Sequence, residues 1–447
     1  MTHFHKRFLP RAPLLPGVLL ILLMLTLPAC SSLKTENSSR RVPVTDFGAV
    51  GDGTTLNTKS IQSAIDHLAT NGGGTLVIPK GVFLSGAIFL KPGVNLSLDE
   101  AAVLKGSTNI TDFPKMKTRI EGQFIDWIPA LVNADHCDHL RITGSGTLDG
   151  DGRIFYAEFW HARRKNPDVT NLAVERPRLM FIENSGDVQV RGITLKDSGF
   201  WNLHLYHCEN VEVADTHFEA PYQKGTVPGP STDGMDIDSC QRVTVRGCSF
   251  AVNDDCIGLK GTKGPFALQD KSSPPIEHIR VIGCTFLAGQ GVVTLGSEAT
   301  VVNDVIVENC QVTGKIPLAR FKIRPDTPQL YENIQYRNIT LSGTEDVFQD
   351  EIIAIKPWTQ FFDLKGATPP KSVVKNITLS NIHGTFGSFG EIEGAPGQTE
   401  ISDITLENIH VNLKDPNLYA HGVKNLIVRD VTVNGKPFAV KDGIAKK

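Results

Sequence analysis

Two short acidic segments hold the residues of this chain that are best suited to chemistry. They are residues 231–234 (STDG) and 253–256 (NDDC), and each is followed by two apolar residues in alternation. The two apolar pairs begin at Met235 and Ile257, so aligning them places Asp255 over Asp233 at one strand spacing, ~4.8 Å. Carboxyl groups this close raise one another's pKa, which prepares one of them to donate a proton. Asp254 lies beside this pair and completes a group of three.

Two cations and one amide fall into register with these carboxyls. Extending the alignment through two further apolar pairs puts Gln290 in the row of Asp254. Arg320 and Lys322 alternate with apolar residues of their own strand, so both are predicted to point outward beside the acidic residues. An acidic group with two cations next to it is typical of a site that binds and transforms a polar substrate.

Each of these residues also has an ordinary interpretation. An Asp before Gly usually forms a turn, which applies to Asp233. The pair Asp254 and Asp255 is compatible with a solvated turn or a calcium site, and Arg320 and Lys322 are compatible with ordinary surface charges. Their coincidence in a single register favours a catalytic cluster over these separate interpretations.

A repeated pattern predicts the elements that position this cluster. Two alternating apolar residues, two small or polar residues and two more alternating apolar residues recur from Val188 onward, at spacings of 22 to 43 residues. Irregular repeats of this length, each with two short strands, indicate a solenoid of stacked coils. A β-sandwich is the alternative, but it does not explain why the pattern returns in one phase. We therefore predict an all-β fold, a single-stranded right-handed parallel β-helix of about ten coils.

The β-helix is predicted to form one domain over residues 42–447. A helix expected over residues 58–69 follows Asn57 and has one apolar face, so we expect it to cap the N-terminal end of the solenoid. Six cysteines recur at two fixed positions of the repeat, as small apolar core residues would, which predicts free thiols rather than disulfides or a metal site. They are Cys137, Cys208, Cys240, Cys248, Cys284 and Cys310.

The first thirty residues have the features of an export signal. Basic residues precede a short apolar run and Leu-Pro-Ala-Cys follows at residues 27–30, so residues 1–29 are predicted to be a signal peptide. The run is too short for a permanent membrane helix. We expect Cys30 to be lipidated and residues 30–41 to form a polar tether, which gives a periplasmic or outer-membrane lipoprotein. The alternative is ordinary cleavage near Ala29 and secretion.

The composition excludes some functions. The chain of 447 residues has a formal net charge of −3, which argues against a dedicated nucleic-acid binder. Hydrophobic residues make up 40% of the chain, enough to build a large core. We expect a monomer that needs no cofactor or metal ion and meets the membrane only through its lipid anchor.

The motifs resemble those of glycoside hydrolase family 28, the polygalacturonase family, over essentially all of residues 42–447. Residues 231–233 are similar to its Asn-Thr-Asp motif, 253–255 to its Gly-Asp-Asp or Gln-Asp-Asp motif, and 320–322 to its Arg-Ile-Lys motif. The resemblance implies a pectin-lyase-like β-helix and inverting hydrolysis of pectic α-glycosidic bonds. It also implies that Asp254 is the general acid and that Asp233 and Asp255 activate water.

Two positions depart from the family pattern. The family's Gly-His-Gly motif is Gly-Gln-Gly at residues 289–291, so the amide of Gln290, which cannot titrate, replaces a histidine. The sugar-contacting Tyr of the family has no counterpart between Tyr336 and Tyr419, and Trp358 is the nearest aromatic candidate. The residues expected to bind substrate are therefore Arg320, Lys322, Gln290 and Trp358.

Three functions are compatible with these features. The first is inverting hydrolysis of an acidic plant-type polysaccharide or oligosaccharide, including rhamnogalacturonan, with acid and base separated by ~6.5–9.5 Å. Arg320 and Lys322 would then pair with a uronate carboxylate or sugar hydroxyls. The second is a uronide lyase that uses the acidic cluster to bind calcium. The third is a glycan-binding β-helix whose catalysis is weak or lost with the histidine.

Overall fold

The structure, a computed structural model, describes residues 40–221, 225–343, 350–438 and 440. The predicted signal peptide, Cys30 and nearly all of the tether lie outside the described residues. The described residues all belong to one compact unit. Within its described part, all but three of the strands belong to parallel ladders. No helix in the described segments is both long and apolar enough to cross a membrane.

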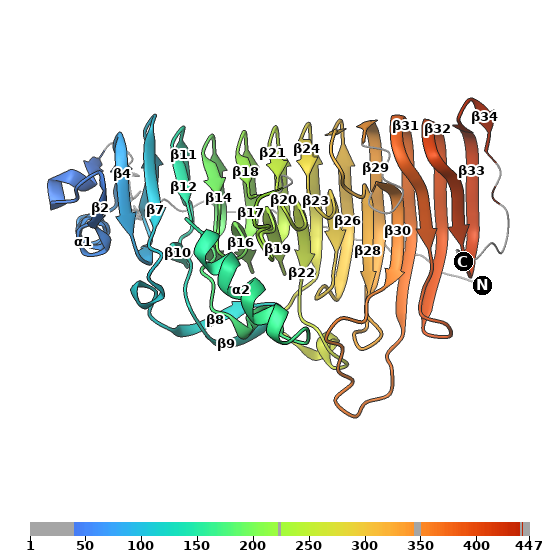
Figure 1. Cartoon of the computed structure of the whole chain (residues 1–447), viewed down its shortest axis with the longest axis horizontal. Coiled ribbons are helices and arrows are strands. Elements are labelled where there is room, and N and C mark those ends of the chain that lie inside the picture. The colour runs from blue at the N-terminus through green and yellow to red at the C-terminus, as the bar shows by residue number, and fades with distance from the viewer. Residues whose placement is uncertain (1–39, 222–224, 344–349, 439, 441–447) are drawn as a thin grey trace, which may run out of the picture. The chain divides into compact units, whose positions relative to one another are not determined.

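Successive coils stack in chain order, and the strands of neighbouring coils pair in parallel (Figure 1). The first ladder contains thirteen strands, more than the ten or so coils predicted, because its earliest strands precede the region where the sequence repeat is clear. They are β1 (Arg41–Pro43), β3 (Gly74–Ile78), β6 (Val94–Leu98), β11 (Arg141–Gly144), β14 (Gly186–Arg191), β17 (Glu209–Ala214), β20 (Gln241–Arg246), β23 (Ile276–Ile282), β26 (Val301–Glu308), β29 (Leu330–Ser342), β31 (Ser372–Ile392), β32 (Thr399–Ala420) and β33 (Val423–Val433).

The second ladder lies next along each coil and matches the second strand of the sequence repeat. Its strands continue into the C-terminal parts of β29 and β31. They are β2 (Asp52–Leu56), β4 (Gly81–Ser85), β7 (Ala102–Gly106), β12 (Thr147–Asp149), β15 (Thr194–Lys196), β18 (His217–Glu219), β21 (Ser249–Ala251), β24 (Thr285–Ala288) and β27 (Gln311–Val312).

A third ladder carries the acidic segments, so a full coil has three strands rather than the two predicted. The repeat that we aligned covers the first two ladders, whereas insertions of variable length separate it from the third. The strands of the third ladder are β5 (Ile88–Leu90), β10 (Val132–Asp135), β13 (Met180–Glu183), β16 (Leu203–Tyr206), β19 (Met235–Asp238), β22 (Ile257–Lys260), β25 (Val293–Leu295), β28 (Ala319–Ile323) and β30 (Glu351–Pro357).

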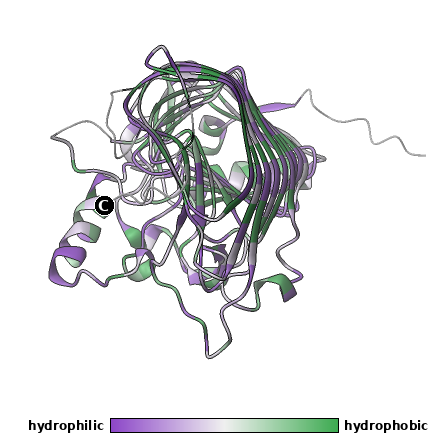
Figure 2. Ribbon diagram, turned by 90° about the vertical axis from the view of Figure 1, so that its right-hand side faces the viewer, coloured by the Kyte–Doolittle hydropathy of each residue, from purple (hydrophilic) through white to green (hydrophobic). Residues whose placement is uncertain are grey.

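The interior between the ladders is apolar because alternate residues of every strand point inward. Figure 2 looks along the stack and shows strands of successive coils lying over one another. Phe218, Phe250 and Phe286 stack from coil to coil with ring centroids 4.7 and 5.1 Å apart. The seven cysteines of the described residues, which include the six in repeat positions and Cys256, are buried and free, as predicted.

In the described part of the chain, two α-helices and one antiparallel hairpin lie outside the parallel ladders. Helix α1 (Thr58–Thr70) buries its apolar face at the N-terminal end, which confirms the predicted cap. The Asn57 side chain does not cap it, since its oxygen accepts a hydrogen bond from the Val50 amide at 2.7 Å. Helix α2 (Arg153–Lys165) and the antiparallel hairpin of β8 (Met116–Ile120) and β9 (Gln123–Trp127) lie beside the third ladder (Figure 1). The minor elements are η1 (Val44–Phe47), η2 (Ile110–Asp112), η3 (Asn171–Ala173), η4 (Ala267–Gln269) and β34 (Lys436–Pro437).

Candidate active site

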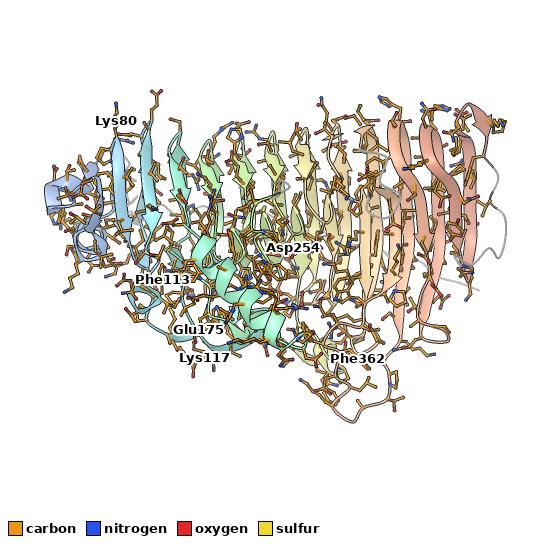
Figure 3. The ribbon with its side chains drawn as sticks, in the orientation of Figure 1. Lys80, Phe113, Lys117, Glu175, Asp254 and Phe362 are labelled. Atoms are coloured by element: carbon orange, nitrogen blue, oxygen red, sulfur yellow. The ribbon has the colours of Figure 1, made fainter. Side chains whose placement is uncertain are left out.

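The predicted register of the acidic residues is confirmed by the third ladder. Met235 of β19 pairs with Ile257 of β22, so Asp233 and Asp255 precede their strands at equivalent positions on neighbouring coils. One oxygen from each of Asp233, Asp254 and Asp255 lies within 4.8 Å of the other two. Figure 3 shows Asp254 midway along the stack of coils. The sequence therefore located the three carboxyls correctly relative to one another.

These nearest oxygens lie closer together than the ~6.5–9.5 Å that we expected between the acid and base of an inverting enzyme. The reason is geometric, because Asp254 and Asp255 are consecutive and Asp233 is one strand spacing, ~4.8 Å, away. A water molecule that forms hydrogen bonds of ~2.7 Å to two oxygens fits between atoms up to ~5.4 Å apart. The group can therefore hold one bridging water.

Asp255 is the ionised member of the group. Its carboxylate is buried, and it accepts hydrogen bonds from Thr294 Oγ1 at 2.7 Å and from Lys322 Nζ at 2.7 Å. Arg320 Nη1 lies 3.3 Å from Oδ1 of the same carboxylate. Burial opposes ionisation, but Lys322, Arg320 and Lys260 outweigh it and lower the pKa of Asp255. Arg320 and Lys322 thus stabilise this carboxylate in addition to facing the cleft.

Asp254 has the opposite electrostatic setting. It is half-buried, and burial together with the charge of Asp255 raises its pKa. Burial, followed by the charge of Asp254, raises the pKa of Asp233 to about 8. A proton on Asp254 removes that second cause, so Asp233 ionises more readily while Asp254 is protonated. The group therefore combines one ionised carboxylate, Asp255, with two carboxyls whose pKa values are raised, Asp233 and Asp254.

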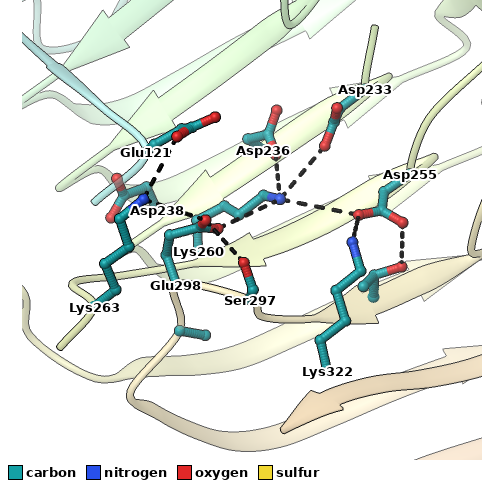
Figure 4. A network of polar contacts seen from close by, with 12 residues as sticks. Glu121, Asp233, Asp236, Asp238, Asp255, Lys260, Lys263, Ser297, Glu298 and Lys322 are labelled. Carbon is teal, nitrogen blue, oxygen red and sulfur yellow. Dashed lines mark hydrogen bonds and ion pairs between the residues drawn. The ribbon is translucent and has the colours of Figure 1, made fainter. Parts of the chain in front are cut away.

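Lys260 is a site residue that the sequence analysis missed. It is the last residue of β22, it is buried, and its ammonium lies 3.5 Å from carboxylate oxygens of both Asp233 and Asp236. It also lies 3.9 Å from Asp255 and 3.8 Å from Glu298 (Figure 4). The available signal was the alternation of β22, which makes Lys260 an outward residue on the strand that follows Asp255.

Gln290 and Trp358, the two predicted departures from the family pattern, both lie at the cleft. The Gln290 side chain donates a hydrogen bond to the Asn253 carbonyl at 3.1 Å, and its main-chain carbonyl accepts one from Arg320. The centroid of the Trp358 ring lies 4.8 Å from Lys322 Nζ and 5.6 Å from Arg320 Cζ. All seven predicted site residues of the β-helix are therefore gathered in one place.

Around the carboxyls and toward their N-terminal side, the cleft is a walled pocket of about 310 Å³, which Lys322, Trp358 and Phe361 also line. Helix α2, which lies between β12 and β13, supplies Phe159, Trp160 and Arg163 to the wall. Trp160 Nε1 donates a hydrogen bond to the Pro228 carbonyl at 2.8 Å. Gly152 before a run of aromatic residues at helical spacing was the signal for this helix.

On the C-terminal side, the cleft continues into a second pocket of about 570 Å³. Four cationic side chains and Trp358 contribute to its lining, and Glu351 is its acidic residue. The cations are Lys315, Arg320, Lys322 and Lys356. A surface of this charge is suited to carboxylate groups along a substrate.

The group of three aspartates does not fit a metal ion well. Both oxygens of Asp255 already face cationic side chains, Lys322 on one and Arg320 on the other. A calcium ion would have to share these oxygens with two fixed positive charges, which repel it. The chemistry of the donor set therefore favours acid and base roles over the calcium-dependent lyase.

Several known proteins are similar to this chain in sequence. A probable polygalacturonase of Vitis vinifera is 30% identical over 313 residues, which cover 68% of this chain and 61% of that protein. An exopolygalacturonase of Zea mays is 26% identical over 388 residues, or 84% of each chain. An exo-poly-alpha-D-galacturonosidase of Dickeya chrysanthemi is 26% identical and covers 77% of this chain, which spans 63% of that protein.

Solved structures show the same fold. The exopolygalacturonase from Thermotoga maritima is 23% identical with a TM-score of 0.62, covering 86% of this chain and 92% of that one. The family 28 exopolygalacturonase of Yersinia enterocolitica is 22% identical with a TM-score of 0.64, covering 89% and 79%. The predicted right-handed parallel β-helix is thereby confirmed. Because the family model of glycosyl hydrolases family 28 matches residues 70–438, the chain belongs to that family of glycosidases.

Proposed function

We propose that this protein is an exo-acting, inverting hydrolase of α-glycosidic bonds in pectic polysaccharides or oligosaccharides. The observation that carries the proposal is the unequal setting of neighbouring carboxyls, since Asp255 is held as a carboxylate by two cations while Asp254 keeps a raised pKa. An inverting hydrolase needs one group of each kind at the scissile bond.

The chemical step follows from these settings. Asp254 donates its proton to the leaving glycosidic oxygen, and a water between Asp233 and Asp255 attacks the anomeric carbon from the opposite face. Asp233 takes the proton of that water, because its carboxylate has a higher proton affinity than that of Asp255. Lys322 and Arg320 keep Asp255 charged throughout the step.

The two sides of the cleft support exo action on an acidic chain. The walled pocket, bounded by helix α2 and by Glu121 next to the β8–β9 hairpin, limits what extends to the N-terminal side of the scissile bond. The cationic pocket on the other side provides partners for the carboxylates of the remaining chain. The names of the relatives from Zea mays, Thermotoga maritima and Yersinia enterocolitica, all exopolygalacturonases, point the same way.

The direct test is incubation of the mature protein with galacturonan, rhamnogalacturonan and their reduced-end oligosaccharides. Exo action predicts a short product from the first minutes, and proton NMR should show the β-anomer of that product before mutarotation. An α-anomer would make a carboxyl of this group a nucleophile instead of a base. An unsaturated, ultraviolet-absorbing product would indicate a lyase. Binding of the oligosaccharide without release of new reducing ends would indicate a glycan-binding protein.

We also propose that the protein is exported and tethered through a lipid on Cys30. The support is the order of basic residues, apolar run and Leu-Pro-Ala-Cys at the start of the chain. Cys30→Ser should move the protein from the membrane fraction to the soluble fraction, because the polar segment that remains has no membrane affinity. Membrane association that is unchanged in Cys30→Ser would contradict the anchor.

A further inference from the structure

One buried ammonium beneath the catalytic carboxyls has more acidic neighbours than it can neutralise. Lys260 Nζ lies between 3.5 and 3.9 Å from carboxylate oxygens of Asp233, Asp236, Asp255 and Glu298 (Figure 4). Lys260 and its four neighbours are all buried. Holding four carboxylates away from water with one cation is costly unless other partners or protons reduce the negative charge.

Two of the four carboxyls have other cations. Asp255 pairs with Lys322 at 2.7 Å. Glu298 lies 4.0 Å from Lys263 and accepts a hydrogen bond from Ser297 Oγ at 2.9 Å. These partners, with Lys260, lower the pKa of both carboxyls although burial opposes it. Both are therefore ionised without depending on Lys260 alone.

Asp233 and Asp236 are the two carboxyls for which Lys260 is the paired cation among the described residues, and each lies 3.5 Å from it. They differ in access to the cleft. Asp233 is 2% exposed and lines the pocket, whereas Asp236 is 0% exposed and neither of its oxygens accepts a hydrogen bond from a donor group in the described part of the chain. A side-chain hydrogen bond between Asp236 and Asp233 requires a proton on one of the two carboxyls, and it raises the pKa of Asp236. A charge on Asp236, which does not reach the cleft, would be more costly than a charge on Asp233.

A glycine on the next coil leaves room for the contact between Asp236 and Lys260. Gly258 pairs with Asp236 in the parallel register, and a Cβ at Gly258 would lie 2.7 Å from both Asp236 Oδ1 and Lys260 Cε. A side chain there would separate the carboxyl from the ammonium. The glycine therefore permits the close approach of Asp236 and Lys260.

The other ionisable groups around Asp236 do not supply it with a partner. His204 pairs with Asp236 on the preceding coil, and burial lowers the pKa of this histidine to about 4, which leaves the ring neutral. The Arg178 guanidinium bonds to His204 Nδ1 at 2.7 Å and to Thr118 Oγ1 at 2.8 Å. Burial, followed by the charge of Asp233, raises the pKa of Asp236 well above its ordinary value.

We propose that Asp236 is a permanently neutral carboxylic acid and that Lys260 is the counter-charge of Asp233, which makes Lys260 a positioning residue for water activation. This inference rests on the proposed hydrolysis. A neutral Asp236 does not compete with the Asp233 carboxylate for the positive charge of Lys260. Two aspartates at the same distance from one ammonium thus have opposite charge states.

Isosteric substitutions test this asymmetry. Asp236→Asn replaces one neutral group by another, so kcat and the pH profile should stay within about threefold of the parent enzyme. Lys260→Met removes the counter-charge, so the acidic limb of the kcat/KM profile should move up by about one to three pH units. Lys375→Met is the matched control, because it removes an exposed lysine paired with Glu332 at 2.8 Å on another part of the stack. It should leave both kcat and the profile unchanged.

An infrared measurement tests the charge of Asp236 without any substrate. The free enzyme near neutral pH should show the C=O stretch of a buried protonated carboxyl, and Asp236→Asn should remove it. A missing band, or an acidic limb that moves to lower pH in Asp236→Asn, would show that Asp236 is ionised and would overturn the proposal. The spectrum decides even if Lys260→Met does not fold, and it is independent of whether the enzyme hydrolyses pectic chains.

Discussion

The two sides of the catalytic carboxyls are built from different parts of the chain. On the N-terminal side, the wall comes from segments inserted between strands, namely helix α2 and the turn of the β8–β9 hairpin, and Phe361 from the segment after β30 lines the same pocket. On the C-terminal side, Arg320, Lys322 and Lys356 project from the strands β28 and β30 themselves. The insertions enclose space, and the strands provide cations, of which Lys322 and Lys356 are paired on neighbouring coils.

This difference separates two tasks that a chain-end hydrolase must combine. Recognition of a chain end needs a wall, which a solenoid strand cannot provide because it runs along the cleft floor. Recognition of a repeating acidic polymer needs cations at regular intervals, which successive coils supply at about 4.8 Å. The inserted side is therefore expected to control where the chain is cut, and the strand side how tightly it is held.

The largest expected effect concerns the carboxyl between the two sides. Asp254→Asn removes the proton donor but keeps its size, so kcat on a natural oligosaccharide should fall by about 10²–10⁴. Activated aryl glycosides need little protonation of the leaving group and should lose much less. Asp233→Asn is the control, because it should impair both substrates alike. Normal turnover of the natural substrate by Asp254→Asn would contradict the assigned roles.

The next effect tests the strand side. Arg320→Ala should raise KM for acidic oligosaccharides by about 10–100-fold, the size expected for a lost charge-assisted hydrogen bond. A smaller fall in kcat should accompany it, because Lys322 still pairs with Asp255 at 2.7 Å. Steady-state kinetics with acidic and carboxyl-reduced substrates will show whether the KM effect depends on the uronate. An equal rise for both would mean that Arg320 does not recognise the carboxylate.

A smaller effect is expected on the inserted side. Trp160→Ala removes an aromatic wall residue and its hydrogen bond to the Pro228 carbonyl, so kcat/KM for short chains should fall by about 2–10-fold. Early products should also become longer, since the wall that stops the chain is weakened. Phe362→Ala is the control, because Phe362 is an exposed aromatic residue in a nearby surface segment (Figure 3). Product length unchanged in Trp160→Ala would argue against the wall.

The sequence predicted the strand side well and the inserted side poorly, for a physical reason. Asp233, Asp255 and Arg320 are fixed by the alternation of core residues, and such a pattern is visible along one chain. Lys260 and Asp236 also alternate outward, but their burial depends on inserted segments that cover the ladder. Since burial gives these two residues their unusual electrostatics, their importance could not be derived from register alone.

The smallest expected effect concerns Glu183, a carboxyl of the third ladder that, unlike Asp233, lies outside both pockets. Glu183 ends β13, and burial followed by the charge of Asp135 raises its pKa to about 7 from 4.5. As pH rises through this interval, the unfolded chain releases the proton first, so the stability present at low pH is progressively lost. Glu183→Gln removes this loss and should raise Tm by about 1–2 °C at about pH 8, with little change at about pH 4. Thermal unfolding at both pH values measures this change in Tm, and kcat should not change.

A Tm increase of the same size at both pH values would show that Glu183 is not the group that titrates. A loss of activity in Glu183→Gln would extend the site beyond the walled pocket.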